Sequence, residues 1–342
     1  MLKKPSILLI YTGGTIGMVV NYETGALQPF DFEHIISQVP ELNQLNVNLS
    51  SFSFDPAIDS SDVTPEIWER LSLIIQENYD RYDGFVILHG TDTMSYTASA
   101  LSFMLHNLSK PVILTGSQLP IGAIHTDGKQ NLITAIEIAA SKDKGKTIVP
   151  EVSIFFGTKL YRGNRTTKHS AEDFDAFASY NYPSLAKSGI AIQFKKHLIL
   201  QPKSDNFFVT PKIDPNVVVL KIFPGINRAT VDTVCSMPNI KGIVLETYGS
   251  GNAPTAQWYF DTLIKAVERG VIVLNVSQCQ AGSVNMSSYD TGLGLLKMGV
   301  ISGYDSTTEA AITKLMHLLG TCSDRNQIIE KLGTSLKGEI SL

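Results

Sequence analysis

Four short runs rich in isoleucine and valine, each followed by a glycine-containing turn, constrain the fold of this chain most strongly. They span residues 7–11, 85–89, 112–115 and 152–156. Such nearly continuous apolar runs are typical of parallel strands that are buried on both faces of a sheet. Between them, residues 93–107 and 127–140 carry apolar side chains at helical spacing. Because crossover helices connect parallel strands, the first half of the chain is predicted to be a doubly wound α/β domain with a mostly parallel sheet.

A polar stretch with several prolines follows this half and is typical of a linker. It covers residues 196–216. A second, smaller α/β unit is predicted after it, with strands at 217–222, 242–246 and 271–276 and helices near 256–268 and 308–319. The expected organisation is therefore a larger N-terminal domain at 1–195, a linker, and a C-terminal α/β domain at 217–342.

Composition limits the partners and the compartment. The chain has 342 residues, 43% of them hydrophobic, which is ample for a buried core. A formal net charge of -4 gives no long-range attraction for polyanions, so nucleic acid and membranes are poor partners and a small molecule is favoured. Three cysteines without metal or redox spacing fit a reducing compartment. The first apolar run is too short for a signal peptide or a membrane span, so a cytoplasmic location is expected.

The run YTGGTIG at residues 11–17 places Thr15 just beyond the carboxyl end of the first predicted strand. Ligands of open α/β sheets bind at that edge, and the glycines let backbone amides approach a bound group closely. A phosphate loop is less favoured, because the run lacks both the dinucleotide-binding glycine order and the Gly-Lys-Ser/Thr ending of a P-loop. A tight turn with a capping threonine is the plain structural alternative.

The run HGTDTM at residues 89–94 places Thr91, Asp92 and Thr93 between a predicted strand and a helix. Capping of that helix would account for Asp92 or Thr93. It would not account for a second hydroxyl at the end of a second strand of the same sheet. The carboxyl ends of parallel strands share one edge, so the threonines of the two runs are expected to converge.

A third run, YRGNRTTK, ends at Lys168 and also follows an apolar strand. Its charges alone would suggest a solvated loop. If Lys168 turned inward beside Asp92, it would have a carboxylate partner and could act as a base. Because a threonine hydroxyl is a weak nucleophile until a neighbour takes its proton, Thr91, Lys168 and Asp92 would then form a nucleophile, a base and its orienting group.

These runs together resemble bacterial type I L-asparaginases, the cytoplasmic form. The likeness extends through most of the chain and includes DSSD at 59–62, GFVILHGTDTMSYTASALSFML, PVILTGSQ, FDAFAS, YGSGNAP and SYDTG. It implies hydrolysis of L-asparagine to L-aspartate and ammonia through an acyl-enzyme, without a metal or an organic cofactor. It also implies a homotetramer, a dimer of dimers, with active sites between neighbouring subunits.

The resemblance assigns roles residue by residue. The family's first nucleophilic threonine falls on Thr15 and its second catalytic threonine on Thr91, with Asp92 and Lys168 completing the triad. Backbone amides near the two threonines are the expected oxyanion donors. The α-amino and α-carboxylate groups of the substrate would be held around Asp59, Ser60, Ser61 and Asp92.

One departure from the family pattern concerns activation of Thr15. Many relatives have a tyrosine after the glycine of the flexible lid, whereas here Gly25 is followed by Ala26. Tyr22 on the same loop or Tyr289, reaching in from a neighbouring subunit, could replace that hydroxyl. Tyr289 is preferred as the catalytic tyrosine, because an ordered loop is the better donor. Ordinary packing is the alternative for both.

A second departure concerns regulation. Some type I enzymes bind asparagine at an effector site with an arginine, a threonine and a cysteine. Thr167 and Cys279 match the last two, but Glu246 holds the arginine's place. A carboxylate repels the carboxylate of an effector, so allosteric activation by asparagine is expected to be weak or absent.

Other functions fit these residues less well. A module that only senses small amides would not need two hydroxyls and a base. An ammonia-supplying subunit of a transfer-RNA amidotransferase would carry an extra N-terminal domain, and fused lipid-cleaving relatives would carry a long C-terminal extension. Glutaminase is the second candidate, because one methylene changes hydrophobic selectivity little.

Overall fold

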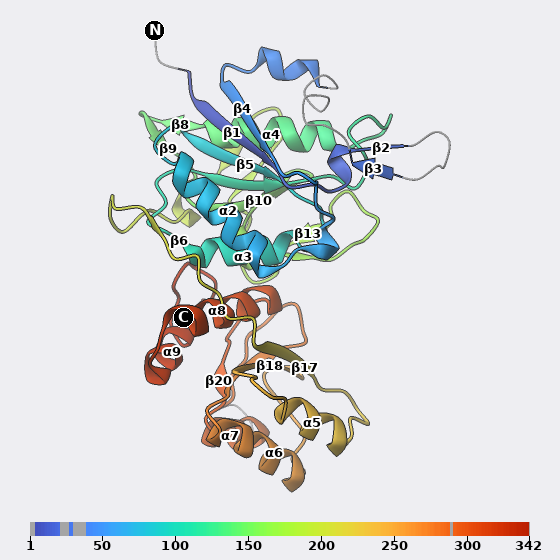
Figure 1. Ribbon diagram of the computed structural model, residues 1–342, viewed down its shortest axis with the longest axis vertical. Coiled ribbons are helices and arrows are strands. Elements are labelled where there is room, and N and C mark those ends of the chain that lie inside the picture. The colour runs from blue at the N-terminus through green and yellow to red at the C-terminus, as the bar shows by residue number, and fades with distance from the viewer. Residues whose placement is uncertain (1–3, 21–26, 30–38, 288–289, 342) are drawn as a thin grey trace. The chain divides into compact units, whose positions relative to one another are not determined.

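The computed structural model describes residues 4–20, 27–29, 39–287 and 290–341. The chain divides into two compact units, Met1–Pro211 and Lys212–Leu342 (Figure 1). The domain limits expected from the sequence, at residues 195 and 217, remain a prediction. The stretch expected to be a linker contains the short helix η5 (Lys196–Leu198) and the strand β16 (Phe208–Val209), which pairs with β6 (Leu105–His106).

The first unit is built on an eight-stranded mixed sheet with the order β15-β14-β11-β10-β7-β5-β1-β4. Its parallel part contains β1 (Ser6–Tyr11), β4 (Asn48–Ser53), β5 (Gly84–Leu88), β7 (Val112–Thr115) and β10 (Val152–Phe156). Its antiparallel edge contains β11 (Lys159–Arg162), β14 (Ala186–Lys187) and β15 (Gln193–Phe194). The four apolar runs thus form neighbouring parallel strands, as their composition predicted.

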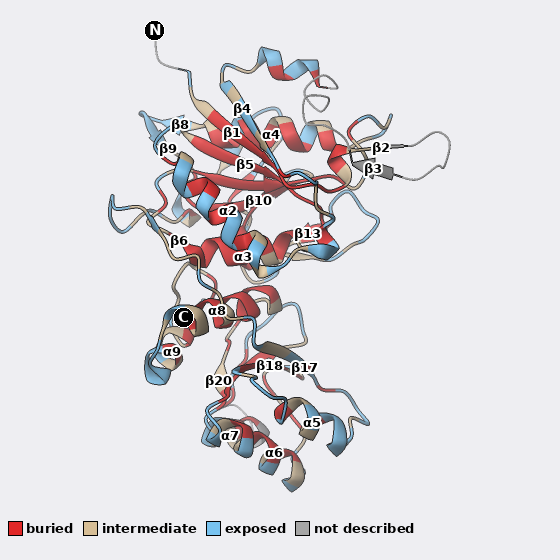
Figure 2. Ribbon diagram, viewed as in Figure 1, coloured by how far each residue is buried: buried red, intermediate tan, exposed pale blue. Residues whose placement is uncertain are grey.

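Helices cover both faces of this sheet. Side chains alternate between the two faces along a strand, so β1 sends Ile7 and Leu9 into one apolar cluster and Leu8 and Ile10 into the other. The first cluster includes α4 (Gly128–Ala140), and the second includes α2 (Pro65–Asn78) and α3 (Met94–Met104). The central strands are consequently buried along their length (Figure 2).

The smaller elements of the first unit are short helices and two-stranded pairings in the connections. The helices are η1 (Thr15–Gly17), η2 (Pro40–Gln44), η3 (Ser60–Asp62) and η4 (Gly163–Arg165). The pairings join β2 (Met18–Val20) to β3 (Leu27–Pro29), β8 (Lys142–Asp143) to β9 (Lys146–Thr147), and β12 (Thr167–Lys168) to β13 (Phe177–Ala178). The helices η1, η3 and η4 follow the strands β1, β4 and β11 along the chain. The predicted site residues lie in or near these connections.

The second unit contains a four-stranded parallel sheet in the order β17-β18-β19-β20. Its strands are β17 (Val217–Lys221), β18 (Gly242–Thr247), β19 (Ile272–Ser277) and β20 (Ile301–Ser302). Its helices are α5 (Arg228–Cys235), α6 (Gln257–Glu268), α7 (Asp290–Lys297), α8 (Thr308–Thr321) and α9 (Arg325–Leu332). The predicted class, a larger doubly wound domain plus a smaller α/β domain, is confirmed. Among the described residues, no helix is both long and apolar enough to cross a membrane.

Candidate active site

Three backbone turns meet at the carboxyl edge of the parallel strands in the first unit. A Cβ atom built on Gly14 would lie 2.5 Å from Gly90 Cα, and one built on Gly90 would lie 2.5 Å from Ser60 Oγ. Only glycine permits backbones to approach this closely, and Gly14 also has a positive φ of 89°. Because Gly14 and Gly90 directly precede Thr15 and Thr91, this contact brings the two threonine-bearing turns together.

The turn after β1 is fixed by its neighbours on both sides. The amide and the hydroxyl of Thr12 both donate to Leu88 O at the end of β5, at 3.0 Å each. Ile58 N donates to Thr12 O at 2.7 Å. Thr15, half-buried, then begins η1, and the N-cap position is Gly14, so the hydroxyl of Thr15 does not cap that helix.

The turn after β5 does not use its polar side chains for capping. Thr93 occupies the N-cap position of α3 but makes no side-chain cap, and its hydroxyl donates instead to Ser60 O at 2.7 Å. Asp92 and Thr91 both contact the amine of Lys168. The capping interpretation of Asp92 and Thr93 therefore does not account for these side chains.

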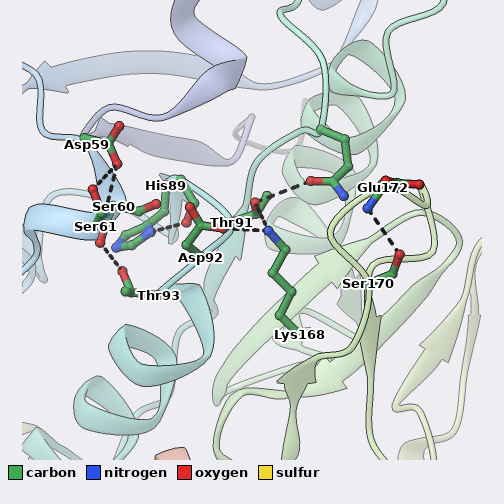
Figure 3. Close-up of polar contacts among 12 residues, drawn as sticks. Asp59, Ser60, Ser61, His89, Thr91, Asp92, Thr93, Lys168, Ser170 and Glu172 are labelled. Carbon is green, nitrogen blue, oxygen red and sulfur yellow. Dashed lines mark hydrogen bonds and ion pairs between the residues drawn. The ribbon is translucent and has the colours of Figure 1, made fainter.

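Lys168 joins the predicted triad in one set of contacts (Figure 3). Its Nζ lies 2.8 Å from Thr91 Oγ1 and 2.7 Å from Asp92 Oδ1. The side chain of Lys168 is 18% exposed, while that of Asp92 is 65% exposed. The amine is thus held against the threonine, and the carboxylate retains an open side from which it can contact a ligand.

The position of Lys168 is set by a buried framework. It lies on β12, opposite Phe177 of β13. The preceding helix η4 packs against α3, where a Cβ on Gly163 would lie 3.0 Å from Ala98 Cβ. At the end of β11, Arg162 Nε donates to Glu151 Oε2 at 2.7 Å, and both side chains are almost fully buried. These contacts restrict the path of the chain into β12.

The predicted substrate-binding turn follows β4. Asp59 caps η3, and its Oδ1 accepts from the Ser61 amide at 2.9 Å and from the Ser61 hydroxyl at 2.8 Å. These two hydrogen bonds lower the pKa of the Asp59 carboxyl, which stays ionised near neutral pH. Ser60 is buried against Gly90, while Asp59 and Ser61 are exposed. An ionised, exposed carboxylate next to this junction suits a ligand ammonium group.

Gln118 belongs to the same arrangement and was not singled out from the sequence. Thr91 Oγ1 lies 3.4 Å from its Oε1, and its Nε2 donates to Asp173 O at 3.1 Å. The backbone amide of Gln118 donates to the carboxylate of Asp127, which also accepts from Asn131 Nδ2 at 3.2 Å. The available signal was its position two residues beyond Gly116, after a third parallel strand in the run PVILTGSQ.

The residues considered for activation of Thr15 are not part of the description. Tyr22, Gly25, Ala26 and Tyr289 lie outside the described residues. Within the described ranges, no group of three or more His, Cys, Asp or Glu side chains is arranged to hold a metal ion.

Comparison with known proteins identifies the family. The model described as "Asparaginase, N-terminal" matches residues 6–200, and the model described as "Glutaminase/Asparaginase C-terminal domain" matches residues 216–332. The chain belongs to the asparaginase family. It is 42% identical to L-asparaginase 1 of Escherichia coli K12 over 342 residues, which cover 99% of both chains. This full-length match confirms the resemblance to the type I branch of the family.

Solved structures of the family share the fold over nearly the whole chain. L-asparaginase I from Vibrio cholerae superposes with a TM-score of 0.89 at 40% identity and covers 99% of this chain and 100% of its own. The thermostable L-asparaginase from Thermococcus kodakarensis gives a TM-score of 0.90 at 32% identity, with 98% and 99% covered. Both units of the chain therefore have counterparts in these asparaginase structures.

Proposed function

We propose that this protein is an L-asparaginase that hydrolyses L-asparagine to L-aspartate and ammonia with threonine nucleophiles. The observation that carries the proposal is the contact of Lys168 Nζ with Thr91 Oγ1 and Asp92 Oδ1, beside the backbone junction that brings Thr15 close. Full-length similarity to L-asparaginase 1 supports the choice of substrate. Glutaminase activity stays the alternative, because the two substrates differ by one methylene.

In the proposed reaction, Thr15 Oγ1 attacks the carboxamide carbon and loses its proton to the deprotonated oxygen of an activating tyrosine. Backbone amides at Thr15 and Thr91 would stabilise the tetrahedral oxyanion. The carbon–nitrogen bond then breaks, and Lys168 supplies a proton through the Thr91 hydroxyl so that the nitrogen leaves as ammonia. Water next attacks the ester on Thr15, and its proton returns to Lys168 through Thr91. The bond to Thr15 Oγ1 then breaks, the activating tyrosine returns its proton to Thr15, and aspartate is released.

In this scheme, Asp59 and Asp92 bind the α-ammonium group of the substrate. The α-ammonium of asparagine requires a carboxylate partner, and both carboxylates are sufficiently exposed to meet it. Ser60 and Ser61 supply polar groups for the α-carboxylate. Since Asp92 also contacts Lys168, binding of the substrate ammonium and orientation of the base occur at the same side chain.

The remaining parts of the proposal concern assembly and the tyrosine. We infer a cytoplasmic homotetramer, a dimer of dimers, and Tyr289 of a neighbouring subunit as the hydroxyl that activates Thr15. The support is the resemblance to type I asparaginases together with alanine at the lid position that holds tyrosine in many relatives.

Ammonia and aspartate release by purified protein tests the proposal. With L-asparagine we expect steady turnover, and with Thr15→Val a loss of roughly 10³-fold or more in kcat, because the variant has no acyl acceptor. Thr15→Ser is the matched control and should keep measurable activity. L-glutamine assayed in parallel decides the substrate preference. Wild-type protein without turnover, or Thr15→Val with full turnover, would show that the proposal is wrong.

A separate expectation concerns the effector site. Glu246 Oε1 accepts from Thr308 Oγ1 at 2.7 Å, and its Oε2 lies 3.4 Å from Lys221 Nζ. The side chain is only 12% exposed, so a carboxylate with its own partners occupies the place of the effector-binding arginine. The rate of ammonia release should therefore follow a hyperbolic dependence on asparagine concentration. A clearly sigmoidal curve would contradict the expected lack of activation by asparagine. Glu246→Gln is the matched control, because it removes the negative charge of the side chain and keeps its size.

A further inference from the structure

A buried chain of hydrogen bonds ends at the peptide that joins Gly90 to Thr91. His89 follows β5 directly and is 1% exposed. Its Nδ1 lies 2.7 Å from Gly90 O, and its Nε2 lies 2.9 Å from Thr97 Oγ1 on α3. Thr97 Oγ1 in turn accepts from Trp68 Nε1 of α2 at 3.0 Å. Two helices are thereby connected through one imidazole ring to the turn that carries Thr91.

The donors and acceptors in this row of hydrogen bonds allow only one tautomer of a neutral His89 ring. A carbonyl oxygen only accepts, so Nδ1 of His89 must carry the hydrogen that meets Gly90 O. The other nitrogen, Nε2, is then an acceptor, and the Thr97 hydroxyl donates to it. That hydroxyl can do so because the indole of Trp68, which is only a donor, occupies its acceptor side. Burial lowers the pKa of His89 to about 4, so the neutral ring is the form present near neutral pH.

The contact with Gly90 O determines where Thr91 points. In a trans peptide the C=O and the following N–H face opposite directions, so a carbonyl held by His89 directs the Thr91 amide away from the ring. Within the described residues, the Thr91 amide has no hydrogen-bond partner. Gly90 itself is confined between Gly14 and Ser60, where no Cβ fits. The hydrogen bond from His89 Nδ1 to Gly90 O therefore orients the peptide between Gly90 and Thr91.

We propose that His89 is a positioning residue, which aims the amide and hydroxyl of Thr91 at the substrate, and that Trp68 and Thr97 keep its ring in the required tautomer. This inference rests on the proposed function, because it concerns the Thr91 side of that site. A merely structural histidine would fill the same space, but its loss would affect stability without depending on which ring nitrogen is replaced.

Two substitutions at His89 separate the ring nitrogens. Asparagine places an amide nitrogen near Nδ1 and can still donate to Gly90 O, whereas glutamine places its amide near Nε2 and cannot. Since oxyanion stabilisation acts only in the transition state, His89→Gln should lower kcat by about 10²-fold while KM changes by less than about threefold. His89→Asn should keep kcat within about tenfold of the wild type. Thermal unfolding of both variants checks that each is folded.

A second pair of variants tests the hydrogen bond between Thr97 and His89. Thr97→Val has nearly the same shape as the wild type but has no hydroxyl, so the ring is held by Gly90 O alone. We expect kcat to fall about tenfold with little change in KM. Thr97→Ser restores the hydroxyl and should return kcat to the wild-type value. If the His89 variants do not fold, this pair decides the matter alone.

The outcomes distinguish this inference from the proposed function. Equal kcat for folded His89→Asn and His89→Gln, or wild-type kcat for Thr97→Val, would overturn the positioning role while leaving asparagine hydrolysis intact. Wild-type protein that releases no ammonia would overturn the proposed function, and the role given to His89 would be lost with it. A selective loss in His89→Gln together with rescue by Thr97→Ser would support both.

Discussion

Replacement of Thr91 by valine is expected to lower kcat for ammonia release from L-asparagine by roughly 10³-fold or more. Valine keeps the shape of the side chain but removes the Oγ1 atom that lies 2.8 Å from Lys168 Nζ. Without this oxygen, the amine has no path for a proton to the leaving nitrogen. Steady-state kinetics of the purified variant, with folding checked by circular dichroism, measures the loss.

Lys168→Met should cause a loss of similar size, because the two side chains act on the same proton. The double variant Thr91→Val/Lys168→Met should then be little worse than either single variant, since residues that act as a unit have non-additive effects. Lys142→Met is a suitable lysine control. Its amine makes a half-exposed ion pair with Asp83 at 2.8 Å, and kcat should stay unchanged. Losses that simply multiply in the double variant would argue for independent roles.

Replacement of Lys314 by methionine is expected to destabilise the second unit by about 3–5 kcal/mol, because it leaves a buried carboxylate without its partner. Lys314 Nζ lies 2.6 Å from Glu339 Oε1, and the two side chains are 4% and 0% exposed. The amine also donates to Thr334 O at 2.7 Å. Burial lowers the pKa of the Lys314 amine, while the neighbouring Glu339 opposes that change. The pair attaches the last residues of the chain to α8.

Urea unfolding of the single and double variants measures this effect. Glu339→Gln alone removes the charge that compensates Lys314 and should also destabilise. The double variant Lys314→Met/Glu339→Gln leaves no unpaired charge, so it should lose less free energy of unfolding than the two single variants combined. A destabilisation below about 1 kcal/mol for Lys314→Met would mean that this buried pair contributes no more to stability than a surface ion pair does.

Local patterns predicted the framework well. The runs at 112–115 and 152–156 coincide with β7 and β10, and the predicted helix at 127–140 differs from α4 by one residue. The two runs are nearly continuous apolar stretches and the helix has apolar side chains at helical spacing; with their glycine-containing ends, these are signals that act over a few residues. Helix α2 and the antiparallel edge of β11, β14 and β15 were not predicted. The strands β14 and β15 are only two residues long, and they depend on the pairing of β14 with β11 and of β15 with β14 rather than on their own composition.

The amino-acid sequence alone identifies the residues that could carry chemistry. Hydroxyls and a carboxylate just after two parallel strands indicated Thr15, Thr91 and Asp92, because parallel strands bring their carboxyl ends to one edge. Lys168 was indicated as an amine that could turn inward beside Asp92, although the strand before it, β11, is antiparallel. The family resemblance added their roles and the substrate-binding turn at Asp59.

Which of these groups touch, and which residues support them, follows from the packing of the folded chain. The contact between Gly14 and Gly90, the approach of Gln118 to Thr91, and the path from Trp68 through Thr97 and His89 to Gly90 all join segments that are distant in sequence. Periodicity and turn signals report on a few neighbouring residues, whereas these contacts depend on how sheet, helices and turns pack. A histidine next to a glycine does not reveal by itself that its second ring nitrogen meets Thr97 of α3, or that Thr97 in turn accepts from Trp68 of α2.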